Sequence, residues 1–224
     1  MYNRKEETTG EEEMITEVFN NYKYEHVSSG KFSISSVGCC WRKKFLELKG
    51  RYKEEYDAKT LRTFDLGDAF HRQACKELME KGHAFGLHVS ATEVNIPEQK
   101  NISGRADQMI ANQATGEIYV IDIKSCSDWT LKKAQEGEVP QNYKDQVNLY
   151  LHFFGLKKGY LIFFGKHKGT VVEYEVAYDQ ARAEQLIAEI NNFIEYNVAK
   201  DIEPPKCEGS HFGCKCCGTK GDFK

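Results

Sequence analysis

Residues 118–124 read Ile-Tyr-Val-Ile-Asp-Ile-Lys, and this stretch decides the fold. Its run of four apolar residues predicts a strand, Glu117–Cys126, that is covered on both faces. Asp122 follows directly after the run, where an unpaired charge would be costly. Because side chains alternate along a strand, Asp122 and Lys124 point to the same side. The stretch therefore predicts a buried strand that presents a carboxylate and an ammonium group together.

The segments around this strand predict an α/β domain, with one mixed sheet flanked by helices. Sequence pattern predicts further strands at His88–Ile96, Ile102–Asn112, Gly159–Gly165 and Thr170–Ala177. Apolar residues at helical spacing predict helices at about Met14–Tyr24, Val37–Leu48, Lys59–Lys81, Pro140–Phe154 and Asp179–Val198, the second capped by Ser33, Ser35 or Ser36. The turn at 112–116 makes a hairpin, and residues 127–139, rich in Lys, Glu and Gly, predict a loop.

Composition divides the chain into four parts. An acidic tail at 1–13 precedes a helical N-terminal part at 14–57, the α/β core spans 58–200, and a cysteine-rich tail occupies 201–224. The chain has 224 residues, 40% of them hydrophobic and 29% charged, which is typical of a globular protein. The apolar runs are far shorter than the roughly 20 residues of a membrane span, and the N-terminus lacks the apolar segment of a signal peptide. We therefore expect a cytoplasmic protein with no membrane partner.

The charge of the chain is unevenly distributed. The five glutamates of residues 1–13 outnumber Arg4 and Lys5 by three, which accounts for the whole net charge of -3. In the balanced remainder, a basic stripe is accompanied by Glu47 and consists of Arg42, Lys43, Lys44, Lys49, Arg51 and Lys53. Such a stripe suits either a phosphate-contacting surface or a solvated helix face. Further candidates for nucleic-acid contacts, or for ordinary packing, are Lys132, Lys133, Trp41, Tyr52, Tyr56, Trp129 and Tyr143.

Asp107 gives the central strand a chemical partner. It ends the sequence Gly104-Arg105-Ala106-Asp107 on the preceding strand, and a hairpin can bring it beside Asp122 and Lys124. Two carboxylates at short range repel each other unless a divalent cation lies between them, and Mg²⁺ or Mn²⁺ favours such oxygen ligands. The pattern indicates a metal site for phosphodiester hydrolysis. An Asp-x-Lys alone is weak evidence for such a site, because in most proteins it forms a surface salt bridge.

With these residues, Gln146-Val-Asn-Leu-Tyr150 completes a pattern that resembles the RecB-type branch of the PD-(D/E)xK nuclease superfamily. Gln146 and Tyr150 share one helix face, and Gly67-Asp-Ala-Phe-His71 is similar to the Gly-x-x-x-His element of that branch. The resemblance implies that His71, Asp107 and Asp122 bind Mg²⁺ or Mn²⁺ with the Ile123 carbonyl. It also implies that Lys124 is catalytic and that Gln146 and Tyr150 position Lys124 and the DNA.

The cysteines refine this resemblance. Eight cysteines without a secretory signal argue against a disulfide framework, and six of them occur at the two ends of the chain. Cys40-Trp-Arg-Lys-Lys-Phe45 and the tail cysteines Cys207, Cys214 and Cys217 resemble the layout of the CRISPR-associated protein 4 exonucleases, the AddB-type nucleases and their viral relatives. That resemblance implies a 4Fe-4S cluster that joins the two ends of the chain.

The cysteine layout also departs from that family. The downstream spacing here is Cys207-x6-Cys214-x-Cys216-Cys217, Trp41 replaces the usual proline, and Cys39 stands beside Cys40. Sequence therefore leaves open which cysteine of each neighbouring pair is a ligand. A zinc site that includes His211 is the alternative to the cluster.

Taken together, the sequence predicts a metal-dependent DNA exonuclease with a PD-(D/E)xK core. The resemblance implies single-stranded DNA or DNA ends as substrate, and a CRISPR integrase or phage recombination proteins as partners. A non-catalytic DNA-binding subunit and a related endonuclease are the alternatives. The oligomeric state stays open.

Overall fold

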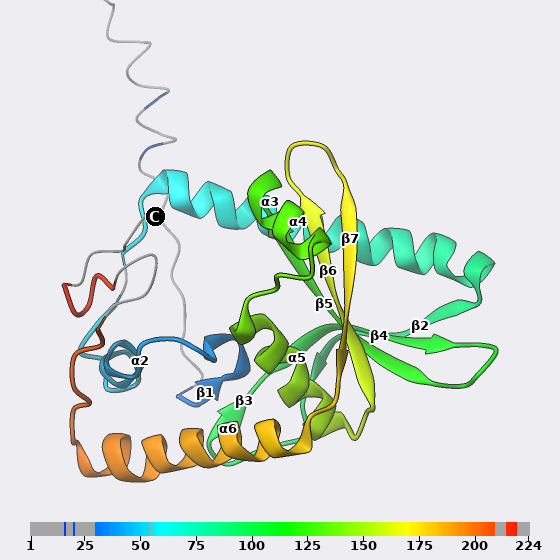
Figure 1. The fold of residues 1–224 in the computed structure, drawn as a ribbon. Coiled ribbons are helices and arrows are strands. Elements are labelled where there is room, and N and C mark those ends of the chain that lie inside the picture. Colours follow the sequence, from blue (N-terminus) through cyan, green and yellow to red (C-terminus); the bar gives the residue numbers. More distant parts are fainter. Residues whose placement is uncertain (1–15, 17–19, 21–29, 54, 209–213, 219–224) are drawn as a thin grey trace, which may run out of the picture.

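The computed structural model describes residues 16, 20, 30–53, 55–208 and 214–218 (Figure 1). The predicted acidic tail, most of the predicted helix Met14–Tyr24 and the alternative zinc ligand His211 lie outside these residues. The α/β architecture is confirmed, with one mixed sheet and helices on both of its faces.

The central sheet has five strands in the order β2-β4-β5-β6-β7. Their bounds are Leu87–Asn95 for β2, Arg105–Asn112 for β4, Ile118–Cys126 for β5, Lys158–Gly165 for β6 and Val171–Ala177 for β7. Only the β5–β6 pair is parallel, and in it Asp122 lies beside Leu161 and Lys124 beside Phe163. The apolar run on β5 is buried on both faces, as the sequence predicts.

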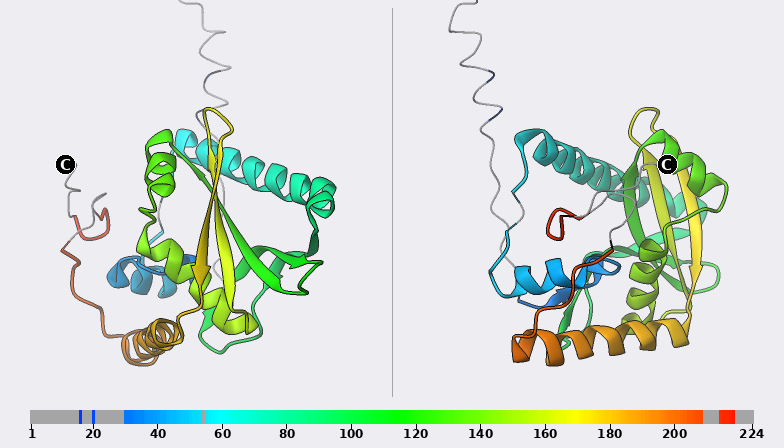
Figure 2. Two further views of the ribbon diagram at one scale, coloured as in Figure 1. Left: turned by 45° about the vertical axis from the view of Figure 1, so that its right-hand side comes forward. Right: turned by 60° about the vertical axis from the view of Figure 1, so that its left-hand side comes forward.

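Two separate cores cover the two faces of the sheet. Helix α3, Ala58–Lys81, packs on one face, where its apolar residues meet Ile121, Ile123 and Phe164. Helix α5, Gln141–Phe154, packs on the opposite face and forms a larger core with β5 and β6. Figure 2 shows the two helices on either side of the strands. Within the described residues, no helix is long and apolar enough to cross a membrane.

A smaller layer joins the N-terminal part to the end of the chain. Strand β1, Phe32–Ser33, pairs in parallel with β3, Ile102–Ser103, and the short helix η1, Ile34–Ser36, follows β1. Helix α2, Trp41–Leu48, then lies beside η3, a π-helical turn at Phe193–Val198 that continues α6, Gln180–Asn192. The Trp41 ring lies 5.6 Å from Phe32 and 4.7 Å from Phe193 between ring centroids, so Trp41 is a packing residue in this layer.

Three local predictions were wrong. The side chain of Cys40, and not a serine, caps α2 by accepting a hydrogen bond from Lys43 N. The strand predicted at Ile102–Asn112 is divided into β3 and β4 by Gly104. The predicted loop at 127–139 contains helix α4, Asp128–Gln135, which Ser127 caps and which buries Leu131 and Ala134. The predicted end of α3 at Lys81 is confirmed, and the short helix η2, Gly82–Phe85, follows it.

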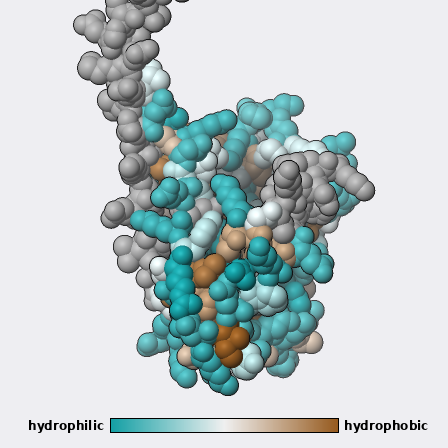
Figure 3. All heavy atoms as spheres, turned by 90° about the vertical axis from the view of Figure 1, so that its left-hand side faces the viewer, coloured by the Kyte–Doolittle hydropathy of each residue, from teal (hydrophilic) through white to brown (hydrophobic). Residues whose placement is uncertain are grey.

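Most of the basic stripe is ion-paired within the chain. Arg42 binds Glu203, while Lys49 and Arg51 both bind Asp201. Lys43 and Lys44 each lie within 4 Å of Glu47 on the same helix. These pairs attach the linker after α6 to α2, and they favour a solvated helix face over a phosphate-binding surface. Figure 3 shows this side of the molecule as mainly hydrophilic, with small apolar patches.

Candidate active site and metal centre

The candidate site lies where β4 and β5 separate. Their ladder ends at the pair Gln108–Ile121, although both strands continue beyond it. Past that point, the backbone N–H of Ile123 donates to Asp107 Oδ2 over 2.6 Å. The carboxylate of Asp107 thus takes the place of a backbone acceptor on β4. Asp107 is thereby fixed directly beside the segment Asp122-Ile123-Lys124.

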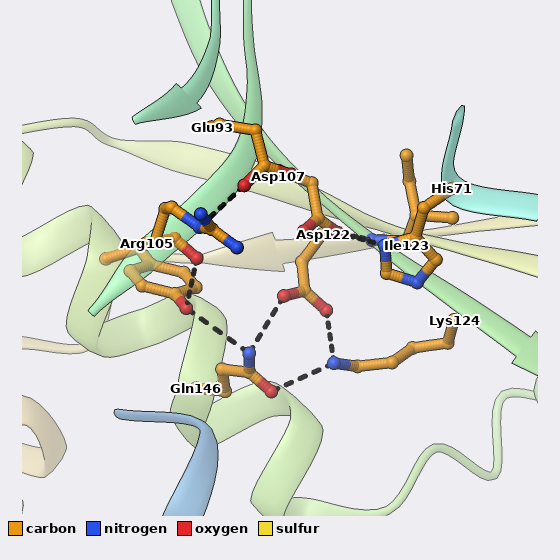
Figure 4. A network of polar contacts seen from close by, with 9 residues as sticks. His71, Glu93, Arg105, Asp107, Asp122, Ile123, Lys124 and Gln146 are labelled. Carbon is orange, nitrogen blue, oxygen red and sulfur yellow. Dashed lines mark hydrogen bonds and ion pairs between the residues drawn. The ribbon is translucent and has the colours of Figure 1, made fainter. Parts of the chain in front are cut away.

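Asp122, Lys124 and Gln146 form a closed triangle of polar contacts (Figure 4). Lys124 Nζ lies 2.7 Å from Asp122 Oδ2 and donates to Gln146 Oε1 over 3.0 Å. Gln146 Nε2 in turn donates to Asp122 Oδ1 over 2.9 Å. The amide of Gln146 therefore joins the carboxylate of Asp122 to the ammonium group of Lys124. Its oxygen faces the lysine and its nitrogen faces the aspartate.

Tyr150 extends this network to the start of β4. Its hydroxyl lies 3.3 Å from Gln146 Nε2 and donates to the backbone carbonyl of Arg105 over 2.9 Å. Gln146 and Tyr150 stand one turn apart on the buried face of α5, as their spacing predicts. Burial raises the pKa of the Tyr150 phenol, so this group is a neutral donor. Helix α5 is thus bound to both strands of the site.

His71 approaches the site from α3, on the other face of the sheet. Its Nδ1 lies 3.5 Å from Asp107 Oδ2, and this hydrogen-bonding partner raises the pKa of His71 above its usual value. Gly67, one turn earlier, faces the Ser125 hydroxyl, which a Cβ atom would meet at 3.3 Å. The absence of a side chain at Gly67 lets α3 lie close to β5, and this brings His71 to Asp107.

Asp122 is the most buried charged group of the site. Only 2% of the residue is exposed, and the loss of solvent raises the pKa of its carboxyl. Its Oδ2 has no aligned hydrogen-bond donor among the described residues, since Lys124 offers an ion pair without hydrogen-bond geometry. An oxygen of this kind suits a cation, and together with His71 and Asp107 it makes the donor set that Mg²⁺ or Mn²⁺ accepts.

The three side chains do not form a tight ligand cage. Among the described residues, the one group of at least three potential ligands that lie within 4.8 Å of one another is formed by cysteines. Asp107 is held by Ile123 N and Asp122 by Lys124 and Gln146. The structure therefore brings His71, Asp107 and Asp122 into one site, while their role as ligands stays a prediction.

Gly104 sets the distance between β4 and α5. A Cβ atom there would lie 2.6 Å from Ile34 Cδ1 and 3.1 Å from Tyr150 Cε1. We expect Gly104→Ala to lower the free energy of unfolding by about 1–3 kcal/mol, as overpacked cores do, and to displace the Tyr150 ring. Denaturant unfolding measures this. Gly67→Ala is the comparison variant. Its Cβ atom would meet the Ser125 hydroxyl at 3.3 Å, which a rotation of that side chain can relieve, and alanine favours a helix, so we expect a smaller loss of stability. Equal destabilisation of the two variants would contradict the prediction.

Sequence analysis did not assign two contacts of the site. The Arg105 carbonyl anchors Tyr150, and the Arg105 side chain pairs with Glu93 on β2 over 2.6 Å. The Tyr143 ring lies 5.0 Å from Lys124 Nζ between ring centroid and nitrogen. Tyr143 precedes Gln146 by three residues, so helical periodicity could have placed both on one face. A carbonyl contact leaves no signal in the sequence.

Four cysteines from the two ends of the chain meet in a second site. The Sγ atoms of Cys40, Cys207, Cys214 and Cys217 lie within 4.8 Å of one another. Cys40 and Cys217 are 3.6 Å apart, and Cys207 N donates to Cys217 Sγ over 3.4 Å. Cys39 and Cys216 are not members of this group. The structure thereby chooses between the neighbouring cysteines that the sequence left open.

The thiols of this group differ in their affinity for protons. Burial raises the pKa of Cys40 to about 12. Burial also acts on Cys217, but hydrogen bonds from the Cys207 backbone and the neighbouring thiols outweigh it and lower the pKa of Cys217 to about 7. The lowered pKa favours the thiolate form of Cys217, which is the form that binds metals. Four convergent sulfur ligands suit a metal centre, either zinc or iron-sulfur.

Comparison with solved structures identifies the fold. The alkaline exonuclease of Laribacter hongkongensis matches with a TM-score of 0.57 and 14% identity, over 78% of this chain and 90% of the exonuclease. Its complex with dAMP matches with a TM-score of 0.58 and 17% identity over the same shares. A phage-related exonuclease from Haemophilus somnus 129PT matches with a TM-score of 0.53 and 14% identity, over 79% and 96% of the two chains.

No protein-family model and no curated protein sequence matches the chain. The similarity to these exonucleases is therefore one of structure, and it extends over most of both chains. The described strands, α3 and α5 also hold the short motifs in one place. This chain has the fold of the Laribacter and Haemophilus exonucleases, joined to a group of four convergent cysteines.

Proposed function

We propose that this protein is a metal-dependent DNA exonuclease that hydrolyses phosphodiester bonds in single-stranded DNA or at DNA ends. One observation carries the proposal: Asp122, Lys124 and Gln146 form a closed triangle at the point where β4 and β5 separate, with Asp107 and His71 directly beside it. An ordinary surface salt bridge is exposed to solvent, whereas the carboxylate of Asp122 is buried at a cost in free energy. The exonuclease fold supports the same activity.

Each residue of the site has a proposed role. His71, Asp107, Asp122 and the Ile123 carbonyl would hold Mg²⁺ or Mn²⁺, which supplies positive charge for the developing charge on the phosphate. Lys124 holds the attacking water or takes its proton, and Gln146 keeps the ammonium group in place through the 3.0 Å contact. Tyr150 holds Gln146 and anchors α5 to the Arg105 carbonyl. DNA as substrate is supported by the dAMP complex of the Laribacter exonuclease.

Linear and circular single-stranded DNA distinguish the proposed activity from its nearest alternative. We expect the protein with Mn²⁺ to degrade an end-labelled linear strand and to leave a circular strand of the same sequence intact, because an exonuclease needs an end. Denaturing gels of both substrates measure this. Cutting of the circle would show an endonuclease, and binding of both strands without cutting would show a DNA-binding subunit.

For the cysteine group, we propose a 4Fe-4S cluster bound by Cys40, Cys207, Cys214 and Cys217. The layout of these residues along the sequence supports iron-sulfur over zinc. Iron, sulfide and zinc contents of protein purified without oxygen, with its visible absorption spectrum, test this proposal. About four irons per chain are expected, whereas one zinc in colourless protein would show a zinc centre. With a cluster, we propose a role in CRISPR spacer acquisition or in phage-type recombination and repair, beside an integrase or recombination proteins.

A further inference from the structure

The lysine of the candidate site has a third contact that the proposed roles above do not use. Besides Asp122 and Gln146, the Nζ atom of Lys124 faces the ring of Tyr143, 5.0 Å from its centroid. An ammonium group at this distance from an aromatic face is attracted by the negative charge of the ring. The contact is partly desolvated, because only 20% of the Lys124 side chain is exposed.

The position of the Tyr143 ring is fixed by the fold. Tyr143 lies in the first turn of α5, and its backbone N–H donates to the Pro140 carbonyl. Its ring packs against Phe163, 6.3 Å away between centroids, and Phe163 is fully buried. Phe163 is the neighbour of Lys124 in the parallel β5–β6 ladder. The same strand pair therefore places the ring and the ammonium group side by side.

We propose that Tyr143 is a positioning residue that holds the Lys124 ammonium group over the candidate site. This inference rests on the proposed nuclease function and adds a residue that the sequence motifs do not contain. Asp122 and Gln146 each serve a second partner, since Asp122 is also a predicted metal ligand and Gln146 also binds Tyr150. Within the part of the chain that the structure describes, the Tyr143 ring has no such competing polar role in the network. It keeps Lys124 in place when the charge of Asp122 is shared with a cation.

Paired substitutions test this role. Tyr143→Phe keeps the ring, and we expect wild-type kcat. Tyr143→Leu keeps apolar volume without the ring, and we expect kcat to fall about tenfold, or about 1.4 kcal/mol, with KM for DNA unchanged. Tyr196→Leu is the matched control. Tyr196 lies on η3, and its ring makes a similar contact with Lys200, whose Nζ is 4.9 Å from the ring centroid. Thermal unfolding confirms that each variant is folded.

Two results would overturn the proposal. Equal kcat in Tyr143→Leu and the wild type would show that the ring does not position the lysine. A raised KM with unchanged kcat in Tyr143→Leu, together with a wild-type KM in Tyr143→Phe, would show instead that the ring stacks on a DNA base.

An NMR measurement separates this proposal from the nuclease function. Protons of the Lys124 side chain beside the ring face are expected to be shifted upfield in the wild type and in Tyr143→Phe, but not in Tyr143→Leu. Lys124→Arg assigns these signals. The upfield shift would support the contact even if the protein cuts no DNA. Identical Lys124 signals in Tyr143→Phe and Tyr143→Leu would overturn the contact even if the protein is an active nuclease.

Discussion

Asp122→Asn is expected to abolish DNA cleavage without destabilising the protein. The amide keeps the size of the carboxyl and still accepts from Gln146 Nε2, but it lacks the charge that a metal ion requires. A metal ion contributes several kcal/mol to such a reaction, so we expect a roughly thousandfold or greater loss of kcat. Initial rates on linear single-stranded DNA with Mn²⁺ measure the loss. Asp128→Asn, an exposed aspartate paired with His167 on the surface, is the control and should keep wild-type activity.

The stability of the same variant tests the electrostatics independently of activity. Burial raises the pKa of Asp122, so the charged form costs more in the folded protein than in the unfolded chain. The contribution of Asp122 to stability therefore falls as the pH rises from its ordinary pKa through the raised one, and asparagine removes this dependence. Without metal, we expect the Tm of Asp122→Asn to equal or exceed that of the wild type near pH 7, and the difference to shrink toward about pH 4.

Metal binding gives a third readout from this pair of proteins. Mn²⁺ should raise the Tm of the wild type, because a ligand that binds only the folded state stabilises it, and should leave Asp122→Asn unchanged. An active Asp122→Asn variant, or one that Mn²⁺ still stabilises like the wild type, would contradict the assignment of Asp122 as a metal ligand.

The sequence predicted those parts of the site that depend on short spacings within one element. Asp122 and Lys124 share a face because strand side chains alternate, and Gln146 and Tyr150 share one because four residues make about one helical turn. The turn at 112–116 predicted the antiparallel pairing of β4 and β5, which places Asp107 beside Asp122. His71 needed the resemblance, because no local rule relates α3 to β4, and the close approach at Gly67 is a property of packing.

Other features could not be predicted because tertiary contacts decide them. Helix α4 was expected to be a loop from its Lys, Glu and Gly content, but burial of Leu131 and Ala134 against the sheet side stabilises it. Its lysines are also less available than a loop would make them, since Lys132 pairs with Glu136 and Lys133 with Glu138. Propensity is a weak guide where packing supplies the larger free energy.

Cys217→Ser is expected to remove most of the bound metal and to destabilise the junction between the two ends of the chain. Cys217 is 5% exposed, its Sγ lies 3.6 Å from Cys40 Sγ, and it accepts a hydrogen bond from Cys207 N, so it contacts both ends of the group. A structural zinc centre contributes about 10–16 kcal/mol of binding free energy in small domains, so the loss of one ligand can remove several kcal/mol of stability. We expect Tm to fall by about 10 °C or more, because 1 kcal/mol corresponds to about 2–4 °C in chains of this size.

The neighbouring cysteines provide the decisive controls. Cys216→Ser and Cys39→Ser each remove a thiol one residue away from a ligand, but neither residue belongs to the four-sulfur group. Both variants should keep the metal content and Tm of the wild type, whereas Cys40→Ser should behave like Cys217→Ser. Iron, sulfide and zinc contents and thermal unfolding of the four variants measure this. If Cys216→Ser loses the metal and Cys217→Ser keeps it, the ligand set is wrong. If all four keep it, the metal centre does not lie at these thiols, and the ion pairs of Arg42, Lys49 and Arg51 join α2 and the residues after it to the segment after η3 without a metal.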